Sequence, residues 1–456
     1  HDGTVFPNMS TAVSAPGKVL LAGGYLVLDR AYTGLVFGLS ARIHVLVHDI
    51  DTSSGVELSE IVVQSPQFLE ATWNYGYHLN GDGGGVNVTQ LQGNRNTPSS
   101  RNPFVETALL YALTYISSIL PISHSIRPAK ITILADNDYY SHSSSSGPTP
   151  APKDGSHHHF TSFNVRLQDA HKTGLGSSAA LVTAFTGALL SHYLPSTSFS
   201  LSSASGRAKL HNLAQAAHCA AQGKVGSGFD VAAAVFGTCV YRRFSPSILS
   251  SVGEAGTPGF ATRVKSVVED SGGEKWDTEI SKGGVTIPRG MALVMCDVDC
   301  GSQTVGMVKK VLEWRKSDEI GSKVLWDELQ LRNVALGRTL DGGDVGGLEG
   351  AFGGIREKIR EMGEKSGVPI EPVEQTELLD AVTKTVEGVK GGVVPGAGGY
   401  DAIVLLVKDD AETLEAIKAF LVQWSEEKKS NVKLLGAKGE LEGARKEDIA
   451  TYREFA

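Results

Sequence analysis

The chain has 456 residues, and its 42 lysines and arginines against 50 aspartates and glutamates give a net charge of −8 at pH 7. This length predicts two or three domains, and the negative charge argues against nucleic acid or an anionic membrane as a partner, because like charges repel. Four cysteines, without metal-ligand spacing, are too few for a disulfide scaffold and predict free thiols in a reducing compartment. With no secretory signal and no apolar run of about 20 residues, the sequence predicts a cytoplasmic protein.

The first half of the chain alternates strands and helices, and we take the fold to begin at Met9. Short apolar runs bounded by turn residues predict strands over residues 19–22, 26–28, 35–39, 43–47, 131–134 and 163–165. Apolar residues at helical spacing predict helices over residues 104–119, 177–193 and 201–222, followed by an apolar segment from residue 231. Serine, proline and histidine crowd residues 141–159, which predicts an exposed, flexible insertion that cannot pack a core.

The second half begins with a change of composition. Glycine, serine, glutamate and lysine replace the apolar periodicity, so residues 249–284 are predicted to connect an N-terminal domain, 9–248, to a C-terminal domain, 285–456. Beyond the connection we expect strands over 291–298 and 402–407, and helices over 305–318, 324–338, 348–366, 374–388 and 411–424. Strands and helices alternate in both halves, which favours layered α+β or α/β architecture.

The sharpest motif runs from Lys172 to Ala180, Lys-Thr-Gly-Leu-Gly-Ser-Ser-Ala-Ala, directly into a predicted helix. A helix N-terminus carries partial positive charge and unpaired N–H groups, so it attracts anions. Glycines before it let a phosphate approach the backbone. The hydroxyls of Ser177 and Ser178 could cap the helix, bind a phosphate or reach a magnesium ion; the plainer interpretation is a capped helix after a tight turn.

Acidic residues are absent from residue 170 to residue 229, while Lys172, Arg207, Lys209 and Lys224 lie within that stretch. The first acid after it is Asp230, in the segment Gly-Ser-Gly-Phe-Asp over residues 226–230. This pattern favours an anion site. Asp230 could then orient a lysine, a metal or an attacking group, or it could simply cap the apolar helix that follows.

Two other glycine-rich segments have the same ambiguity. Pro16-Gly17-Lys18 leads into a strand, so Lys18 is either a solvated turn lysine or a site residue. Residues 393–401 have the sequence Val-Val-Pro-Gly-Ala-Gly-Gly-Tyr-Asp, and their glycines either bring the backbone close to a ligand or form a tight connection between strands. No Walker P-loop occurs. Gly174, Gly176 and Ala179 fit the dinucleotide pattern G-x-G-x-x-A, but the acid expected about 20 residues later to hold a ribose is absent, which argues against a nicotinamide enzyme.

Taken together and in this order, Pro16-Gly17-Lys18, residues 174–180 and residues 395–399 resemble the three motifs of the GHMP kinase superfamily, across essentially the whole chain. Within it, residues 22–28, 102–104, 172–174, 226–230 and 301–304 are similar to the eukaryotic, fungal-type phosphomevalonate kinases. Mevalonate kinases typically have Gly-Glu-His where this chain has Gly23-Gly24-Tyr25, which disfavours that upstream activity.

The resemblance implies a two-domain α+β fold, with a ribosomal-protein-S5-like N-terminal domain, a ferredoxin-like C-terminal domain and the active site between them. It implies ATP with Mg²⁺ as donor and 5-phosphomevalonate as acceptor. It also implies site roles: Lys18, Lys172 and Asp230 in catalysis; Gly174, Leu175, Gly176, Ser177, Ser178 and Ala179 for ATP; Lys18, Tyr25, Ser302, Thr304 and Gly398 for the acceptor; Ser178 for magnesium.

The chemistry of the acceptor refines these roles. A phosphate monoester is largely dianionic at pH 7, because its second pKa is about 6, so its attacking oxygen needs little deprotonation. The site must instead bring two polyanions together by positioning and charge neutralisation. We therefore expect Asp230 to orient Lys18 or magnesium. If the acceptor were a hydroxyl, as in other GHMP kinases, Asp230 would matter as a base; a third possibility is a GHMP-like binding protein without catalysis.

Overall fold

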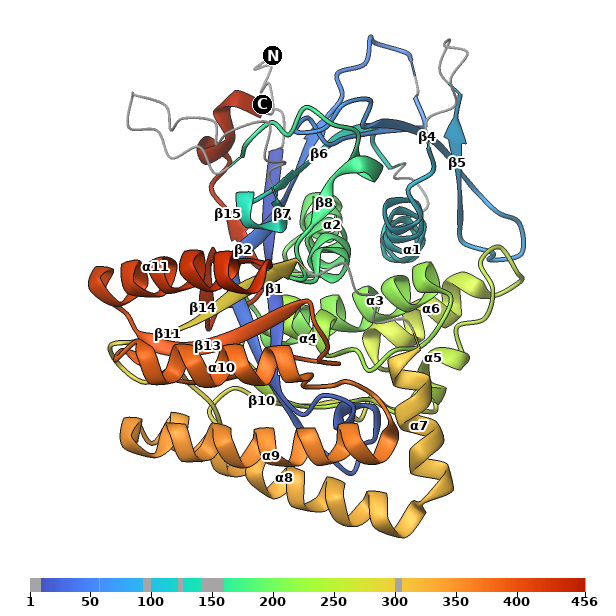
Figure 1. Cartoon of the computed structure of the whole chain (residues 1–456). Coiled ribbons are helices and arrows are strands. Elements are labelled where there is room, and N and C mark those ends of the chain that lie inside the picture. Colours follow the sequence, from blue (N-terminus) through green and yellow to red (C-terminus); the bar gives the residue numbers. More distant parts are fainter. Residues whose placement is uncertain are drawn as a thin grey trace.

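The computed structural model describes residues 10–56, 58–92, 100–121, 126–141, 160–299 and 306–455. One sheet of thirteen strands runs through the described part of the molecule, and its main path has the order β12-β13-β11-β14-β2-β6-β3-β4-β5 (Figure 1). The strands before residue 290 are β1 (Ser10–Ala22), β2 (Gly34–Asp49), β3 (Glu60–Gln64), β4 (Thr72–Leu79), β5 (Val86–Leu91), β6 (Ala129–Ala135), β7 (Tyr140–Ser141), β8 (His171–Lys172), β9 (Cys239–Arg242) and β10 (Glu279–Ser281). The later strands are β11 (Met291–Asp299), β12 (Val389–Val393), β13 (Ala402–Lys408), β14 (Asn431–Glu440) and β15 (Arg445–Glu447).

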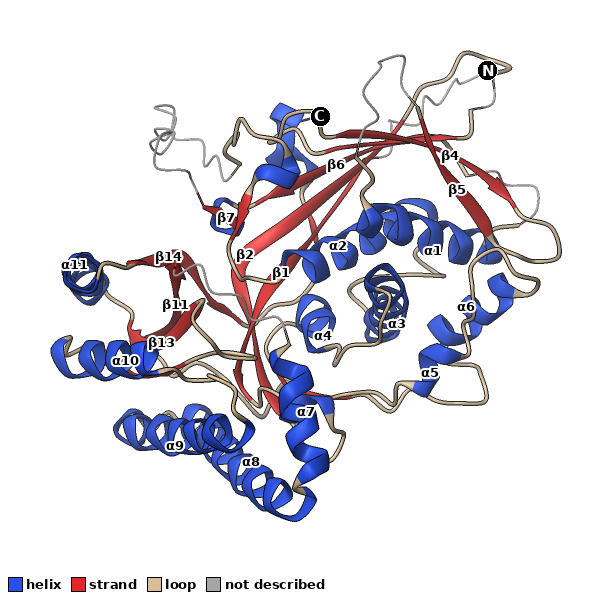
Figure 2. Ribbon diagram, turned by 45° about the vertical axis from the view of Figure 1, so that its right-hand side comes forward, coloured by secondary structure: helices blue, strands red, loops and turns tan. Residues whose placement is uncertain are grey.

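The helices of the first half cover one face of the sheet around β1 and β2 (Figure 2). They are α1 (Pro103–Ile119), α2 (Ser177–Tyr193), α3 (Ala204–Gln222), α4 (Phe229–Phe236), α5 (Ser247–Ser250) and α6 (Phe260–Glu269). Helix α2 packs against α1, α3, α4 and both long strands, and it has the predicted bounds. Because neighbours surround it, α2 is apolar on nearly all its faces.

The second half forms a smaller antiparallel sheet, β12-β13-β11-β14. Its apolar side chains divide between two cores: one faces α10 (Val373–Thr385) and α11 (Ala411–Lys428), and the other joins the main core beside α9 (Leu348–Ser366). Helices α7 (Met307–Ser317) and α8 (Glu319–Asp341) complete this half. Strand β14 also pairs with β2, at Gly439 with Leu39 and Glu440 with Gly38, so the two halves share one sheet.

Several predicted strands have other bounds or another structure in the folded chain. The two strands predicted over residues 35–39 and 43–47 are one strand, β2, which pairs with β1 along nearly its whole length. Arg42, between the two apolar runs, is buried and donates hydrogen bonds to Ser14 and to the carbonyl of Gly443. Residues 26–28 form a short 3₁₀ helix rather than a strand. The strand predicted over 163–165 is wrong: this segment is not a strand, although Phe163 stacks on Phe68 and backbone hydrogen bonds join the segment to the loop before β4.

Two regions were predicted to lack packed structure: the connection between the domains and the insertion. The segment expected to connect the domains, 249–284, contains α6, whose buried face packs against α1 and α3; the domain boundaries themselves stay predictions. The predicted insertion, 141–159, lies outside the described residues apart from Ser141. Among the helices of the described ranges, none is long and apolar enough to cross a membrane.

Candidate active site

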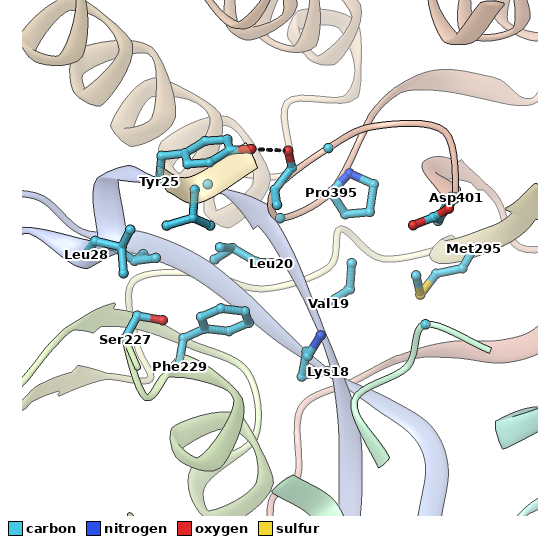
Figure 3. Close-up of a pocket in the computed structure, with 18 residues that line it drawn as sticks. Lys18, Val19, Leu20, Tyr25, Leu28, Ser227, Phe229, Met295, Pro395 and Asp401 are labelled. Atoms are coloured by element: carbon cyan, nitrogen blue, oxygen red, sulfur yellow. Dashed lines mark hydrogen bonds between the residues drawn. The ribbon is translucent and has the colours of Figure 1, made fainter. Parts of the chain in front are cut away.

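The three glycine-rich segments, far apart in the chain, meet at one place (Figure 3). The backbone N–H of Lys18 donates to the carbonyl of Leu175 over 3.0 Å, which joins the first segment to the second. The N–H of Gly396 donates to the carbonyl of Leu20, also over 3.0 Å, which joins the third to the first. Gly24 lies so close to Gly396 that a side chain at residue 24 would overlap its carbonyl. Glycine is therefore required where these backbones touch.

These contacts enclose a cavity of about 360 Å³, within the range of small-molecule sites. Of the residues predicted from the sequence, Lys18, Tyr25, Gly174 and Gly398 line it. The other lining residues include Phe229 and Ser227 on one side, and Met295, Pro395 and Asp401 on the other (Figure 3). Val308 lines the cavity as well. The cavity thus receives side chains from both halves of the molecule.

Lys18 supplies the positive charge of this cavity. It follows a break in the register between β1 and β2, and its Nζ lies 5.4 Å from the ring centroid of Phe229, the first residue of α4. Burial lowers the pKa of Lys18 from its usual 10.5, while the negative charge of Asp230 acts in the opposite direction. Asp230 is in the first turn of α4, where its Oδ1 accepts from the N–H of Val231 over 2.9 Å. The N-cap is Gly228, so Asp230 is not the cap of this helix.

The phosphate-loop candidate ends at an open helix terminus. Gly176 is the N-cap of α2 in left-handed conformation, with φ of 79°, and no side chain caps the helix. The N–H groups of the first turn are thus left for an anion. A Cβ at Gly176 would lie 2.6 Å from Cε of Lys18, so only glycine leaves room for that side chain. Leu175 and Ala179 are buried beneath the loop.

A second, smaller cavity of about 80 Å³ lies beside the start of α2 and is lined by three more of the predicted residues. Lys172, Ser177 and Ser178 line it, together with Asn102 and Phe104 from the start of α1. Lys172 is therefore placed across the loop from Lys18 rather than in the same cavity. The Oγ of Ser178 lies 3.1 Å from Nε2 of His218, a residue that sequence analysis did not single out.

The third glycine segment is held by its neighbours. The hydroxyl of Tyr25 donates to the carbonyl of Ala397 over 2.6 Å, and burial raises the pKa of Tyr25. The N–H of Gly399 donates to the carbonyl of Ile370 over 2.7 Å, and a side chain at Gly398 would overlap that residue. Tyr25 thus fixes the loop with its hydroxyl while its ring lines the cavity.

The remaining predicted residues, Ser302 and Thr304, lie outside the described residues. Helix α7, which begins at Met307, places Val308 at the cavity. Its Arg315 bonds to Asp29 over 3.1 Å and lies 3.9 Å from the ring centroid of Trp326. The sequence did not indicate that Val308 or Met295 lines the site, because apolar residues in a helix or a strand are usually assigned to the hydrophobic core.

A larger side chain at Gly174 should block ATP binding without lowering the stability of the fold. A Cβ at Gly174 meets no atom of the described residues within 4 Å, and the backbone of Gly174 is not left-handed. We therefore expect Gly174→Val to keep the wild-type melting temperature but to lose ATP binding, because the isopropyl group would occupy the loop side of the cavity. Titration calorimetry with ATP, alongside a thermal melt, measures both; unchanged ATP affinity would count against the phosphate-loop assignment.

The dependence of kcat/KM on pH should reveal the ionisation of Lys18. The protonated ammonium is the form that attracts phosphate. Above the pH of about 6 at which the acceptor phosphate ionises, kcat/KM should therefore stay level up to the pKa of Lys18 and fall beyond it, at a pH below 10.5 because burial lowers that pKa. Asp230→Asn removes the charge that raises the pKa of Lys18 and should move this fall to lower pH. Measuring kcat/KM against pH for both proteins tests this; an alkaline fall at the same pH in both would contradict it.

The chain is similar to known proteins over its whole length. A family model described as the GHMP kinases N terminal domain matches residues 158–238. The phosphomevalonate kinase of Gibberella zeae is 60% identical over 444 residues, 97% of each chain, and that of Aspergillus fumigatus is 50% identical over 98% of each. A solved structure of Streptococcus pneumoniae phosphomevalonate kinase with phosphomevalonate and AMPPNP aligns with a TM-score of 0.59 at 16% identity, over 94% of this chain and 99% of that one.

The structural likeness, at such low identity, speaks for the fold alone, and it confirms the predicted two-domain GHMP kinase fold. The identities to the fungal relatives confirm the resemblance drawn from the motifs. The chain therefore belongs to the phosphomevalonate kinase family of GHMP kinases.

Proposed function

We propose that this protein transfers the γ-phosphoryl group of ATP to the phosphate of (R)-5-phosphomevalonate, giving 5-diphosphomevalonate and ADP in the mevalonate pathway of isoprenoid and sterol biosynthesis. An oxygen of the acceptor phosphate attacks the γ-phosphorus, and the bond from that phosphorus to the bridging oxygen of ADP breaks. The observation that carries this function is the meeting of all three glycine segments around Lys18, in a chain 60% identical to a phosphomevalonate kinase.

The roles of the side chains follow from charge. Two polyanions must approach each other, and Lys18, Lys172 and the uncapped N-terminus of α2 surround the place where they would meet. Such fixed positive groups stabilise the charge that develops during phosphoryl transfer. The negative charge of Asp230 opposes the effect of burial on Lys18 and so favours the charged ammonium; orienting this ammonium is the further role proposed for the carboxylate. The acceptor is already ionised, so this arrangement needs no strong base.

Magnesium is the ion we propose to accompany ATP. Among the residues that the structure describes, no three His, Cys, Asp or Glu side chains gather as a metal site. This fits Mg²⁺, which is commonly held by one or two carboxylates, waters and the substrate phosphates. The hydroxyl of Ser178 and the carboxylate of Asp230 are the protein groups proposed to hold it, where it would neutralise phosphate charge. The cytoplasm remains the predicted compartment.

An acceptor panel tests the proposal. We expect ADP release from ATP with 5-phosphomevalonate, and at most traces with mevalonate, galactose or homoserine. Turnover with one of those alcohols instead would show a hydroxyl-acceptor kinase. ATP that is bound but turned over with no acceptor would indicate a binding protein, and either result would overturn the proposed reaction.

A further inference from the structure

We propose that His218 is a positioning residue for phosphoryl transfer, and that it acts by fixing the hydroxyl of Ser178 at the mouth of the phosphate-binding helix α2. The inference rests on the proposed function, because it assigns Ser178 to the ATP site. It adds a residue that does not itself line either cavity.

Three helices begin around the His218 ring. The residue lies near the end of α3 and is 2% exposed, and its Nε2 is 3.1 Å from Oγ of Ser178 in the first turn of α2. Its ring stacks on Phe104 in the first turn of α1, with centroids 5.6 Å apart and planes at 25°. It is also close enough to Asp230, in the first turn of α4, for that carboxylate to act on its charge. One imidazole thus contacts the starts of α1 and α2, and the charge of Asp230 at the start of α4 acts on it.

The contact with Ser178 has a consequence for α2. Serine hydroxyls near a helix start readily bond to nearby backbone groups, but here no side chain caps α2 and the Ser178 hydroxyl is engaged by His218. The N–H groups of the first turn therefore stay free for phosphate, and the hydroxyl oxygen is held in one place at the edge of the smaller cavity. Without the imidazole the hydroxyl would rotate freely and compete for those N–H groups.

Histidine suits this task in its neutral form. Burial lowers the pKa of His218, and the partial positive charge of the helix N-termini also disfavours an imidazolium. A neutral imidazole has one donor and one acceptor nitrogen, so Nε2 can bond the hydroxyl in either direction. Phenylalanine would retain the stack on Phe104 but lose this hydrogen bond, which makes His218→Phe the informative substitution.

A double-mutant cycle on nucleotide binding tests the proposal. Titration calorimetry with ATP in MgCl₂, without acceptor, gives Kd for the wild type, His218→Phe, Ser178→Ala and the double variant. Losing one neutral hydrogen bond should raise Kd about 3–10-fold in each single variant. If His218 acts through Ser178, the double variant should bind no more weakly than Ser178→Ala alone.

The matched control is His192→Phe. His192 is also buried, but it lies at the far end of α2, where it bonds to Thr11 and Asp49. This variant should lose thermal stability without a change in Kd for ATP, which separates a general effect of losing a buried histidine from the proposed effect. If His218→Phe does not fold, His218→Leu, which is equally unable to hydrogen-bond Ser178, takes its place in the same cycle.

Two results would overturn the proposal: an unchanged Kd in the folded His218 variant, or effects of the two substitutions that multiply in the double variant. Neither depends on the acceptor, because none is present. A failure of the proposed reaction would appear in the acceptor panel, and a failure of the His218 assignment would appear in the ATP titrations.

Discussion

Replacing Lys18 by methionine is expected to lower kcat about 10²–10³-fold, the usual loss when one electrostatic contact to a transition state is removed. Methionine keeps the length and apolar body of the side chain but removes the only part that can neutralise phosphate. Lys172→Met should be similarly damaging, because its ammonium lies on the other side of the same glycine loop. Lys418→Met on α11 serves as the control for loss of a lysine and should keep the wild-type kcat, because this exposed lysine forms a surface ion pair with Glu415, three residues away on the same helix.

Asp230→Asn should lose less than either lysine variant. Asparagine keeps the shape and one oxygen, and only the negative charge beside Lys18 is removed. The residual rate of Asp230→Asn should rise as the pH passes about 6, where the acceptor phosphate ionises. Measurements of kcat against pH for all three variants decide between the roles: if Asp230→Asn proves the most damaged and shows no dependence on acceptor ionisation, Asp230 is a general base and the acceptor is a hydroxyl.

Gly176→Ala should also reduce catalysis strongly, and its effect should fall mainly on activity rather than on stability. The Cβ would lie 2.6 Å from Cε of Lys18, and the flexible lysine would yield, so its ammonium would leave the place where phosphate is neutralised. We expect a loss of kcat about as large as for one electrostatic contact, 10²-fold. The left-handed backbone adds a cost of about 1–2 kcal/mol in stability.

Gly223→Ala provides the matched control. Gly223, the C-cap of α3, has φ of 73° against 79° at Gly176, and a Cβ there meets no atom within 4 Å. Both variants carry the same kind of backbone strain, but only Gly176→Ala displaces Lys18. Comparable melting temperatures with a loss of kcat confined to Gly176→Ala are expected; equal kcat in the two variants would show that Lys18 keeps its place.

The sequence could predict what local patterns encode. Helix α2 was predicted to its residue because glycines precede it and Pro195 follows it closely. Arg42 shows the limit for strands: a charged residue between two apolar runs looks like a break. Only the fold shows that this residue pairs with β1 as part of one strand and that Ser14 and the carbonyl of Gly443 accept hydrogen bonds from its buried side chain. The turn at Gly23-Gly24 was predicted, whereas the 3₁₀ helix after it depends on the left-handed backbone of Tyr25.

In the candidate site, too, local sequence motifs identified some residues, and others could be found only from the fold. Glycine motifs identified Lys18, Gly174 and Gly398, because backbone approach to a phosphate leaves a local signature. Phe229 and His218 carry no such signature, since their roles arise from contacts with Lys18 and Ser178 that only the fold creates. The placement of Lys172 in a separate cavity from Lys18 is likewise a property of how the loop folds back, not of the spacing of the residues.

Identifying the bond that the enzyme forms is the most direct test of the proposed transfer to a phosphate acceptor. Phosphorus NMR of the product made from ATP and 5-phosphomevalonate distinguishes the two possible acceptors on that substrate. Transfer to the phosphate gives a diphosphate, with two phosphorus signals split by coupling to each other, and this is the predicted result. Transfer to the hydroxyl on the third carbon would give two uncoupled monoester signals, and that spectrum would contradict the assignment of a phosphate acceptor.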